Sequence, residues 1–213
     1  MPTHQVDLPA RYFMSNTEPT SQSRLKVINL FGPPGVGKSA ARSGIFWLMK
    51  AYHLSVEEVS EYAKYLVLTG QTWRLREEQL NLFTEQLHKQ LITQRNGYEY
   101  AVTDSPLQLC SFYAPKSYFK NFPILIDEVH ESFDNLNFFL TRDMSNDTPF
   151  EDRGRAHDRN QSIETEHQMR EFLDAKNIPY INIEMKSPID LTIPWQVMEH
   201  VCPGMMKMPV FPT

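Results

Sequence analysis

Eight consecutive residues near the start of the chain have the types and spacing needed to bind a phosphate chain. They fit the P-loop pattern G-x-x-x-x-G-K-[ST] and are Gly32, Pro33, Pro34, Gly35, Val36, Gly37, Lys38 and Ser39. The glycines let backbone N–H groups turn inward around an anion, and the helix that follows adds the positive end of its dipole. Lys38 can reach the β- and γ-phosphates of ATP, and the Ser39 hydroxyl can bind Mg²⁺. We therefore predict an ATP and Mg²⁺ site over residues 32–40, with Ala40 as its last member.

The chain in front of this loop supports the prediction. Leu25 to Phe31 is an apolar run typical of a buried strand, so the loop would join a strand to a helix. The plain alternative is a glycine-proline turn before an ordinary helix. All four fixed positions of the pattern are present, which favours the phosphate site.

Asp104 is the second candidate for chemistry. It ends a β-branched and aromatic stretch, Tyr98 to Thr103, that predicts a strand, and it precedes Ser105-Pro106. An aspartate at such a junction can simply cap the next helix. With a P-loop in the same chain we favour a catalytic role: the carboxylate accepts the proton of an attacking hydroxyl or holds Mg²⁺ through water.

Asp127 and Glu128 favour a different chemistry. They follow an apolar run, Phe122 to Ile126, that we interpret as a strand, so the pair resembles the Walker B residues of hydrolytic ATPases. In that class the aspartate orients Mg²⁺ and the glutamate polarises a water. The alternative is that Asp127 caps a short helix. The rest of an ATPase module, a sensor-like strand and a long helical lid, does not follow in the sequence.

A cluster of arginines lies in the polar stretch from Ser145 to Gln161. Arg153, Arg155 and Arg159 fall within seven positions, with Gly154 between the first two. Guanidinium groups stabilise the charge that spreads over a transferring phosphoryl group. We therefore predict a lid over about residues 145–161 that closes on the ligand and excludes water. A solvated loop of mixed charge is the alternative.

Five more residues are candidates for binding an acceptor substrate. Four are polar or aromatic residues of the region between the P-loop helix and the Asp104 strand, and one follows a predicted strand at 137–141: Glu61, Lys64, Trp73, Gln86 and Arg142. Most charged residues on helices face water, which is the plain alternative for each of them.

The periodicity of the apolar residues predicts an α/β fold. Helices are expected after the P-loop, over 56–67, in a long stretch after Gly70 that Asn96-Gly97 closes, and over 162–176; a further strand is expected at 180–184. Strands that alternate with helices form a parallel sheet with helices on both faces, and ligands bind beyond the carboxyl ends of its strands. We expect a polar arm at 1–23, one domain at 24–186, and a Pro/Met-rich tail at 187–213 that could dock through Trp195, Val197 and Met198.

The composition is that of a globular cytoplasmic protein. Of the 213 residues 41% are hydrophobic, the net charge is -5, and the two cysteines have no CxxC spacing. The negative charge argues against general binding of nucleic acid through its phosphates, without excluding a local basic cleft. No run has the length of a signal peptide core or a membrane span.

Together these motifs resemble the P-loop kinases of nucleosides and nucleotides, most closely the nicotinamide riboside kinase-like branch. The likeness spans roughly Leu25 to Glu184, and the general appearance of the sequence is that of a phage enzyme. The resemblance implies that Glu61 meets the acceptor, that Asp104 is the catalytic aspartate and that the three arginines form the lid. The family usually has Asp-Gly-x-Arg in the lid, whereas this chain has Asp152-Arg153-Gly154-Arg155.

The main hypothesis from the sequence is an ATP-dependent kinase acting on a nucleoside, a nucleotide or a modified base. A variant of it phosphorylates a hydroxymethylated base within DNA. The rival hypothesis is a regulatory ATPase or switch that uses Asp127-Glu128, and the plainest one is a protein that binds nucleotide without turnover.

Overall fold

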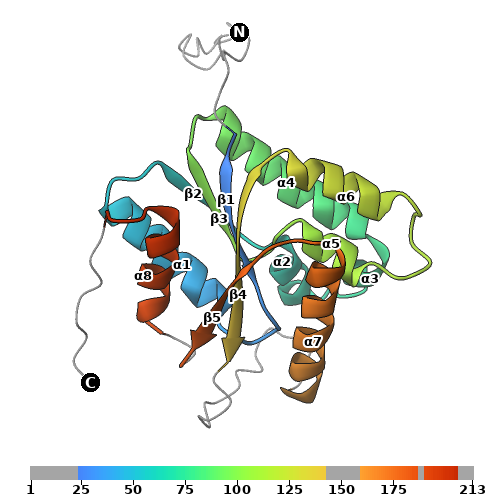
Figure 1. Ribbon diagram of the computed structural model, residues 1–213. Helices are drawn as coiled ribbons and strands as arrows, with labels where there is room; N and C mark the ends of the chain where they lie inside the picture. The colour runs from blue at the N-terminus through green and yellow to red at the C-terminus, as the bar shows by residue number, and fades with distance from the viewer. Residues whose placement is uncertain (1–23, 143–158, 187–189, 206–213) are drawn as a thin grey trace, which may run out of the picture.

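The computed structural model describes residues 24–142, 159–186 and 190–205, which form a five-stranded parallel sheet with helices on both faces (Figure 1). The strand order is β2-β3-β1-β4-β5, and every pairing is parallel. The strands are β1 Lys26–Phe31, β2 Val56–Val59, β3 Tyr100–Thr103, β4 Asp134–Arg142 and β5 Ile181–Met185. The predicted three-layer α/β architecture is confirmed.

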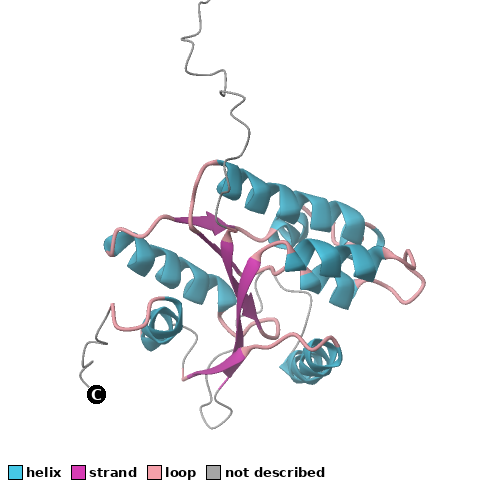
Figure 2. Cartoon of the chain, turned by 45° about the horizontal axis from the view of Figure 1, so that its top comes forward, coloured by secondary structure: helices cyan, strands magenta, loops and turns pink. Residues whose placement is uncertain are grey.

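Two helices cover one face of the sheet and the others gather on the opposite face, as Figure 2 shows. The first layer consists of α1 Lys38–Ala51 and α8 Thr192–Val201. The second comprises α2 Tyr62–Leu68, α3 Arg74–Glu77, α4 Gln79–Arg95, α5 Gln108–Tyr113, α6 Phe122–Glu131 and α7 Arg159–Ala175. None of the described helices is long and apolar enough to span a bilayer.

The central strand β1 is apolar on both sides because both of its faces are covered. Ile28 and Leu30 pack in the core under α1 and α8, while Val27 and Phe31 point to the opposite layer. Successive side chains of a strand alternate between the two faces, so a strand buried on both faces is a nearly continuous apolar run. The apolar run before the P-loop therefore predicts the buried strand β1 correctly.

The register of the sheet brings the ends of three strands to the same edge. Thr103 of β3 lies beside Asn29 of β1 and beside Val59 of β2. The loops that follow β1, β2 and β3 therefore leave the sheet close together. After β1 the chain forms β2 at the outer side of the sheet, then β3 next to β1, and then β4 on the opposite side of β1. This edge is therefore a topological switch point, where α/β proteins bind ligands.

The strand predicted at Phe122 to Ile126 is wrong, because these residues begin helix α6. Phe122, Ile126 and His130 are its buried side chains and recur every fourth residue, whereas Ile124 is 63% exposed. A short apolar run fits a strand and a helix equally well, and only its period and flanks separate them. Pro123 lies in the first turn, where a proline is compatible with a helix.

Two other predictions change in the structure. The helix expected over 56–67 is instead strand β2 followed by helix α2, because Val56 and Val59 face opposite layers of the core. The segment expected to be a C-terminal tail contains helix α8, in which Ile193, Val197 and Met198 are fully buried. That helix belongs to the domain. The N-terminal arm at 1–23 lies outside the described residues.

The long helix predicted after Gly70 is confirmed as α4, which ends at Arg95 before Asn96 and Gly97. Gly97 has a φ of +77°, a conformation that glycine adopts without strain. The predicted strand before Asp104 and the last predicted strand are confirmed as β3 and β5, and the helix expected over 162–176 is α7.

Helix α8 lies against α1 where α1 has a glycine. A Cβ atom built on Gly44 would stand 2.8 Å from Cγ of Pro194, which is closer than real Cβ contacts. We predict that Gly44→Ala destabilises the domain by about 1–2 kcal/mol, because overpacking outweighs the gain in helix propensity of about 1 kcal/mol. Urea unfolding would measure this loss.

The neighbouring change Ser43→Ala is the matched control, since Ser43 is exposed on the same helix and should tolerate alanine. Adding Pro194→Ala to Gly44→Ala should recover most of the loss. A Gly44→Ala protein as stable as the parent would contradict a close approach of the two helices.

Candidate active site

The P-loop turns sharply between β1 and α1 because three of its residues take positive φ angles. Gly32, Gly35 and Gly37 have φ values of +138°, +85° and +109°. At Gly32 any Cβ atom would lie 2.5 Å from the carbonyl oxygen of Leu140 on the neighbouring strand β4. The first glycine of the motif is therefore required both by its backbone conformation and by the close approach of β4.

Lys38 lies within the loop and holds its carbonyl groups. Its Nζ atom donates hydrogen bonds to the carbonyl oxygens of Gly32 at 2.6 Å and of Pro33 at 2.9 Å. Helix α1 begins at Lys38, so the same site has the N–H groups of a first helical turn. The charge of Lys38 and the N–H groups at a helix start suit a polyphosphate, as the motif predicts.

Asp104 is held next to the P-loop by two side chains of α1. Its Oδ2 accepts a hydrogen bond from Ser39 Oγ at 2.8 Å, and its Oδ1 accepts one from Arg42 Nη1 at 2.6 Å. The Asp104 side chain is only 1% exposed, so its charge depends on these partners. The Ser39 hydroxyl and a carboxylate at hydrogen-bond distance are hard oxygen donors of the kind that Mg²⁺ prefers, so the pair fits the predicted cation.

Two members of this cluster, Arg42 and Glu58, belong to no sequence motif. The Arg42 guanidinium bridges Asp104 and Glu58, and its side chain is 14% exposed. A signal existed for Arg42, since a residue three positions after Ser39 lies on the same side of a helix. Glu58 gave no signal, because its contact depends on how α1 lies across β2.

Glu61 lies at the same edge of the sheet as Asp104. It is the residue before α2, two positions after β2 ends, and β2 and β3 end in register. Burial raises the pKa of the Glu61 carboxyl, and the negative charge of Asp104 raises it further, while Lys38 and Lys64 act in the opposite direction. Burial and then the charge of Glu61 also raise the pKa of the Tyr113 hydroxyl. The Glu61 carboxyl therefore lies near the P-loop residue Lys38 and near Tyr113 of α5.

The other predicted acceptor residues lie at different depths. Gln86 is buried on α4, and its Nε2 donates to the Thr103 hydroxyl at 3.0 Å, next to Asp104. Lys64 is exposed on α2, and Trp73 is 54% exposed at the start of α3. Arg142 contacts the P-loop instead, because its Nη2 donates to the carbonyl oxygen of Gly35 at 2.7 Å.

Asp127 has a structural role that excludes the Walker B interpretation. It lies inside helix α6, and both of its carboxylate oxygens are 2.6 Å from Nζ of Lys176. Gln108 Nε2 also donates to Asp127, so this carboxylate links α5 and α6 to the end of α7. The interpretation of Asp127 as a magnesium ligand was therefore wrong, because it required a strand that ends at this residue.

The predicted lid falls mostly outside the described residues. Arg153 and Arg155 lie in the segment 143–158, which the structure does not describe, and Arg159 is the first residue of α7. The lid stays a prediction.

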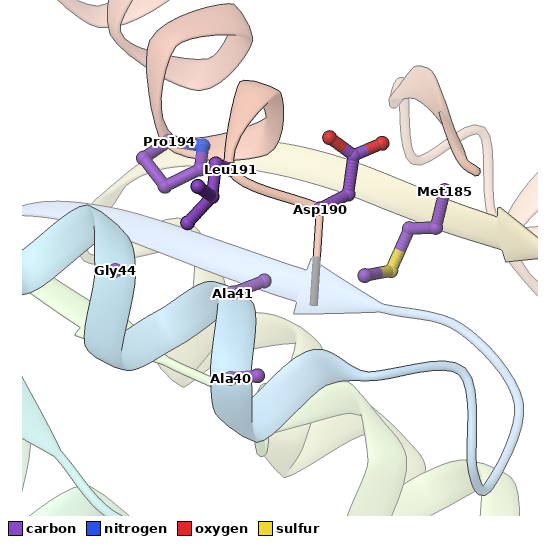
Figure 3. Close-up of a pocket in the computed structure, with 7 residues that line it drawn as sticks. All are labelled: Ala40, Ala41, Gly44, Met185, Asp190, Leu191 and Pro194. Atoms are coloured by element: carbon purple, nitrogen blue, oxygen red, sulfur yellow. The ribbon is translucent and has the colours of Figure 1, made fainter. Parts of the chain in front are cut away.

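A small pocket adjoins the first turns of α1 on the other side of the sheet. Figure 3 shows Leu191 and Pro194 facing Ala41 and Gly44 across it. Its remaining lining residues are Ala40, Met185 and Asp190. The Asp190 carboxylate accepts hydrogen bonds from the backbone and hydroxyl of Thr192 at 2.9 and 2.7 Å, so it caps the start of α8. The pocket is thus mainly apolar and stands next to the P-loop helix.

We predict that Arg42→Met destabilises the protein by about 3–5 kcal/mol, because it leaves the buried charge of Asp104 with its ion-pair partner removed. Denaturant unfolding measures the loss. Adding Asp104→Asn should recover much of it, since the orphaned charge is then gone.

Arg74→Met is a matched control for this change. Arg74 forms an ion pair with Glu78 four residues along, and both side chains are more exposed than those of the Arg42 pair. We expect it to cost much less than Arg42→Met, because water screens this more exposed pair. Equal losses in the two arginine variants would contradict the special role of the Arg42 pair.

We also predict that Glu61→Gln stabilises the protein at pH 7. The pKa of Glu61 is raised in the folded state, so ionisation of this group opposes folding as pH rises above its unfolded value of about 4.3. The gain in melting temperature should shrink as the pH falls toward 4, where the carboxyl is protonated in both states. A gain that grows toward low pH would contradict the raised pKa.

A solved structure of another protein shares this fold. The thymidylate kinase from Ehrlichia chaffeensis superposes with a TM-score of 0.54 at 12% identity, over 84% of this chain and 100% of that one. The structure of APE1195 gives a TM-score of 0.39 at 18% identity, over 72% and 73% of the two chains. A search of curated proteins gave no match.

The first of these likenesses shows a shared fold and no more. The family comparison covers more than the P-loop: residues 27–188 match the family described as AAA domain, from the central strand β1 to just past β5. The chain therefore belongs to the AAA domain family AAA_28.

Proposed function

We propose that this protein is a cytoplasmic, ATP-dependent kinase that transfers the γ-phosphoryl group to a nucleoside, a nucleotide or a modified base. One observation carries the proposal: two carboxylates lie beside the P-loop. Asp104 accepts a hydrogen bond from Ser39 of the loop, and Glu61 lies at the same edge of the sheet. Ser39 with Asp104 suits Mg²⁺ binding in a P-loop site, and Glu61 is the further carboxylate that an acceptor hydroxyl needs. Two carboxylates beside the loop suit a reaction in which a hydroxyl attacks phosphorus.

The donor half of the site consists of the P-loop and the start of α1. Lys38 exchanges the carbonyls of Gly32 and Pro33 for phosphate oxygens, and backbone N–H groups at the start of α1 bind the phosphate chain. Ser39 and Asp104 are the residues that would hold Mg²⁺, which neutralises charge between the β- and γ-phosphates when it is bound.

Asp104 and Glu61 have different roles in this proposal. Both oxygens of Asp104 already have partners, because Ser39 binds one and Arg42 binds the other. Glu61 has a raised pKa, which suits a group that takes the proton of the acceptor hydroxyl. We therefore assign proton removal to Glu61, and charge and cation binding to Asp104.

The acceptor lies on the side of α2 and α4 in this proposal. Glu61 and Gln86 lie beside the end of β3, with Lys64 and Trp73 farther out on the surface. The likeness of the motifs to the nicotinamide riboside kinase-like branch and to phage enzymes supports this placement. Arg153, Arg155 and Arg159 complete the proposal as lid residues.

The test measures ATP consumption and transfer of labelled phosphate with separate acceptors: nucleosides, nucleoside monophosphates and DNA that carries hydroxymethylated bases. We expect ADP to form only with an acceptor. Lys38→Met should lower kcat by about 10²-fold or more, and Glu61→Gln by about 10²–10⁴-fold.

The pH dependence of the rate distinguishes the role of Glu61 from that of Asp104. The parent rate should rise with pH through the raised pKa of Glu61, and Glu61→Gln should lose this acidic limb. Asp104→Asn should weaken the dependence on Mg²⁺ and keep the limb. Glu128→Gln, an exposed change on α6, is the control with no expected effect.

ATP hydrolysis at the same rate with and without every acceptor would overturn the kinase proposal. It would favour a switch-type ATPase, which the family description AAA domain also accommodates.

A further inference from the structure

Side chains hold four successive carbonyl groups of the P-loop. Lys38 Nζ holds those of Gly32 and Pro33. Ser162 Oγ, on α7, donates to the carbonyl oxygen of Pro34 at 2.8 Å. Arg142 Nη2, at the end of β4, donates to that of Gly35 at 2.7 Å.

Only two of these four peptide groups carry an N–H. The carbonyls of Gly32 and Pro33 precede Pro33 and Pro34, and proline has no amide hydrogen. The carbonyl of Pro34 shares its peptide plane with the N–H of Gly35, and the carbonyl of Gly35 shares its plane with the N–H of Val36. In a trans peptide the C=O and the N–H point in opposite directions. A side chain that fixes the carbonyl therefore fixes the direction of the N–H.

We propose that Ser162 and Arg142 are positioning residues of the donor site. Ser162 holds the Pro34 peptide group so that the N–H of Gly35 points to the phosphate chain, and Arg142 holds the Gly35 peptide group, whose Val36 N–H closes the loop turn onto the carbonyl oxygen of Pro33 at 3.4 Å. The proposal rests on the proposed function to the extent that the P-loop binds nucleotide phosphate. It assigns Arg142 to the loop that binds the donor nucleotide rather than to the acceptor site. Ser162 belongs to no sequence motif, and its role follows from its hydrogen bond to Pro34.

Both residues come from rigid parts of the fold. Arg142 is the last residue of β4, and it pairs with Met185 of β5, while residues 134–139 of the same strand pair with β1. Ser162 lies in the first turns of α7, whose Met169 and Leu173 are fully buried against Phe31 and Phe139. Glycine at position 35 is flexible without such contacts, since its φ of +85° is one of many that glycine can adopt. Holding the loop in advance lowers the entropy lost when phosphate binds.

The experiment measures the dissociation constants of Mg·ADP and Mg·ATP by calorimetry, independently of any acceptor. Ser162→Ala should weaken both by about 2- to 10-fold, the range expected for one neutral hydrogen bond. Ser162→Thr keeps the hydroxyl and should restore binding. Arg142→Gln should weaken binding by about 10- to 100-fold, because its hydrogen bond is charge-assisted.

The steady-state constants provide a readout that a purely structural role does not move. KM for ATP should rise in Ser162→Ala, while kcat and KM for the acceptor stay near the parent values. Because Ser162 is uncharged, its loss should not depend on salt, which separates positioning from attraction of the phosphate by a charge.

Two control variants lose comparable interactions away from the loop. Ser132→Ala removes a hydroxyl that donates to the carbonyl of Val129 at 2.6 Å, and Arg170→Gln removes contacts with Glu166 and Asn182. Neither should change nucleotide affinity. Ser162→Ala binding Mg·ADP as tightly as the parent would overturn the proposal, as would an equal loss in the controls.

The proposal and the proposed function fail in different ways. If the parent binds Mg·ADP and the Ser162 and Arg142 variants bind it more weakly, the positioning role holds even where no acceptor is phosphorylated. If the parent does not bind Mg·ADP, the phosphate site itself is wrong and both proposals are overturned.

Discussion

The geometry of the site depends on one buried charge, the carboxylate of Asp104. At 1% exposure it is stable only because Ser39 and Arg42 bind its two oxygens. Those partners lie on α1, and Arg42 also pairs with Glu58 of β2. The charge therefore joins the ends of two strands to the first turn of the P-loop helix. The same contacts leave Asp104 little freedom, which is why we propose Glu61 for proton removal.

The parallel sheet separates the two halves of the proposed reaction. The P-loop follows β1 at the centre, and α1 with α8 covers the face that holds the apolar pocket. Glu61 and Gln86 belong to β2–α2 and α4 on the other side of β1. The proposed transfer of the phosphoryl group takes place at the edge of the sheet where the strand order reverses. Parallel sheets of this kind bind their ligands at that edge.

Much of the architecture could be predicted because its signals are local and strong. The glycines and lysine of the P-loop, the strand before Asp104 and the long helix α4 have patterns that few other structures share. The failures have one cause. Phe122 to Ile126 and Val56 to Val59 are short, and a few apolar residues fit either period until the rest of the core selects one. The docking of the C-terminal segment through Val197 and Met198 is confirmed, but the helix α8 that contains them has no local signal, since α1 and β5 provide the surface that buries it.

The local sequence specifies a phosphate-binding loop, because a tight glycine turn and a helix start depend on neighbouring residues alone. It also places Asp104 at the end of a strand. Only the tertiary structure decides which side chains surround them. Arg42 meets Asp104 from 62 positions away, and Ser162 meets Pro34 from 128 positions away. Such contacts follow from strand order and register, which arise when the whole sheet forms, and no short stretch of sequence contains them.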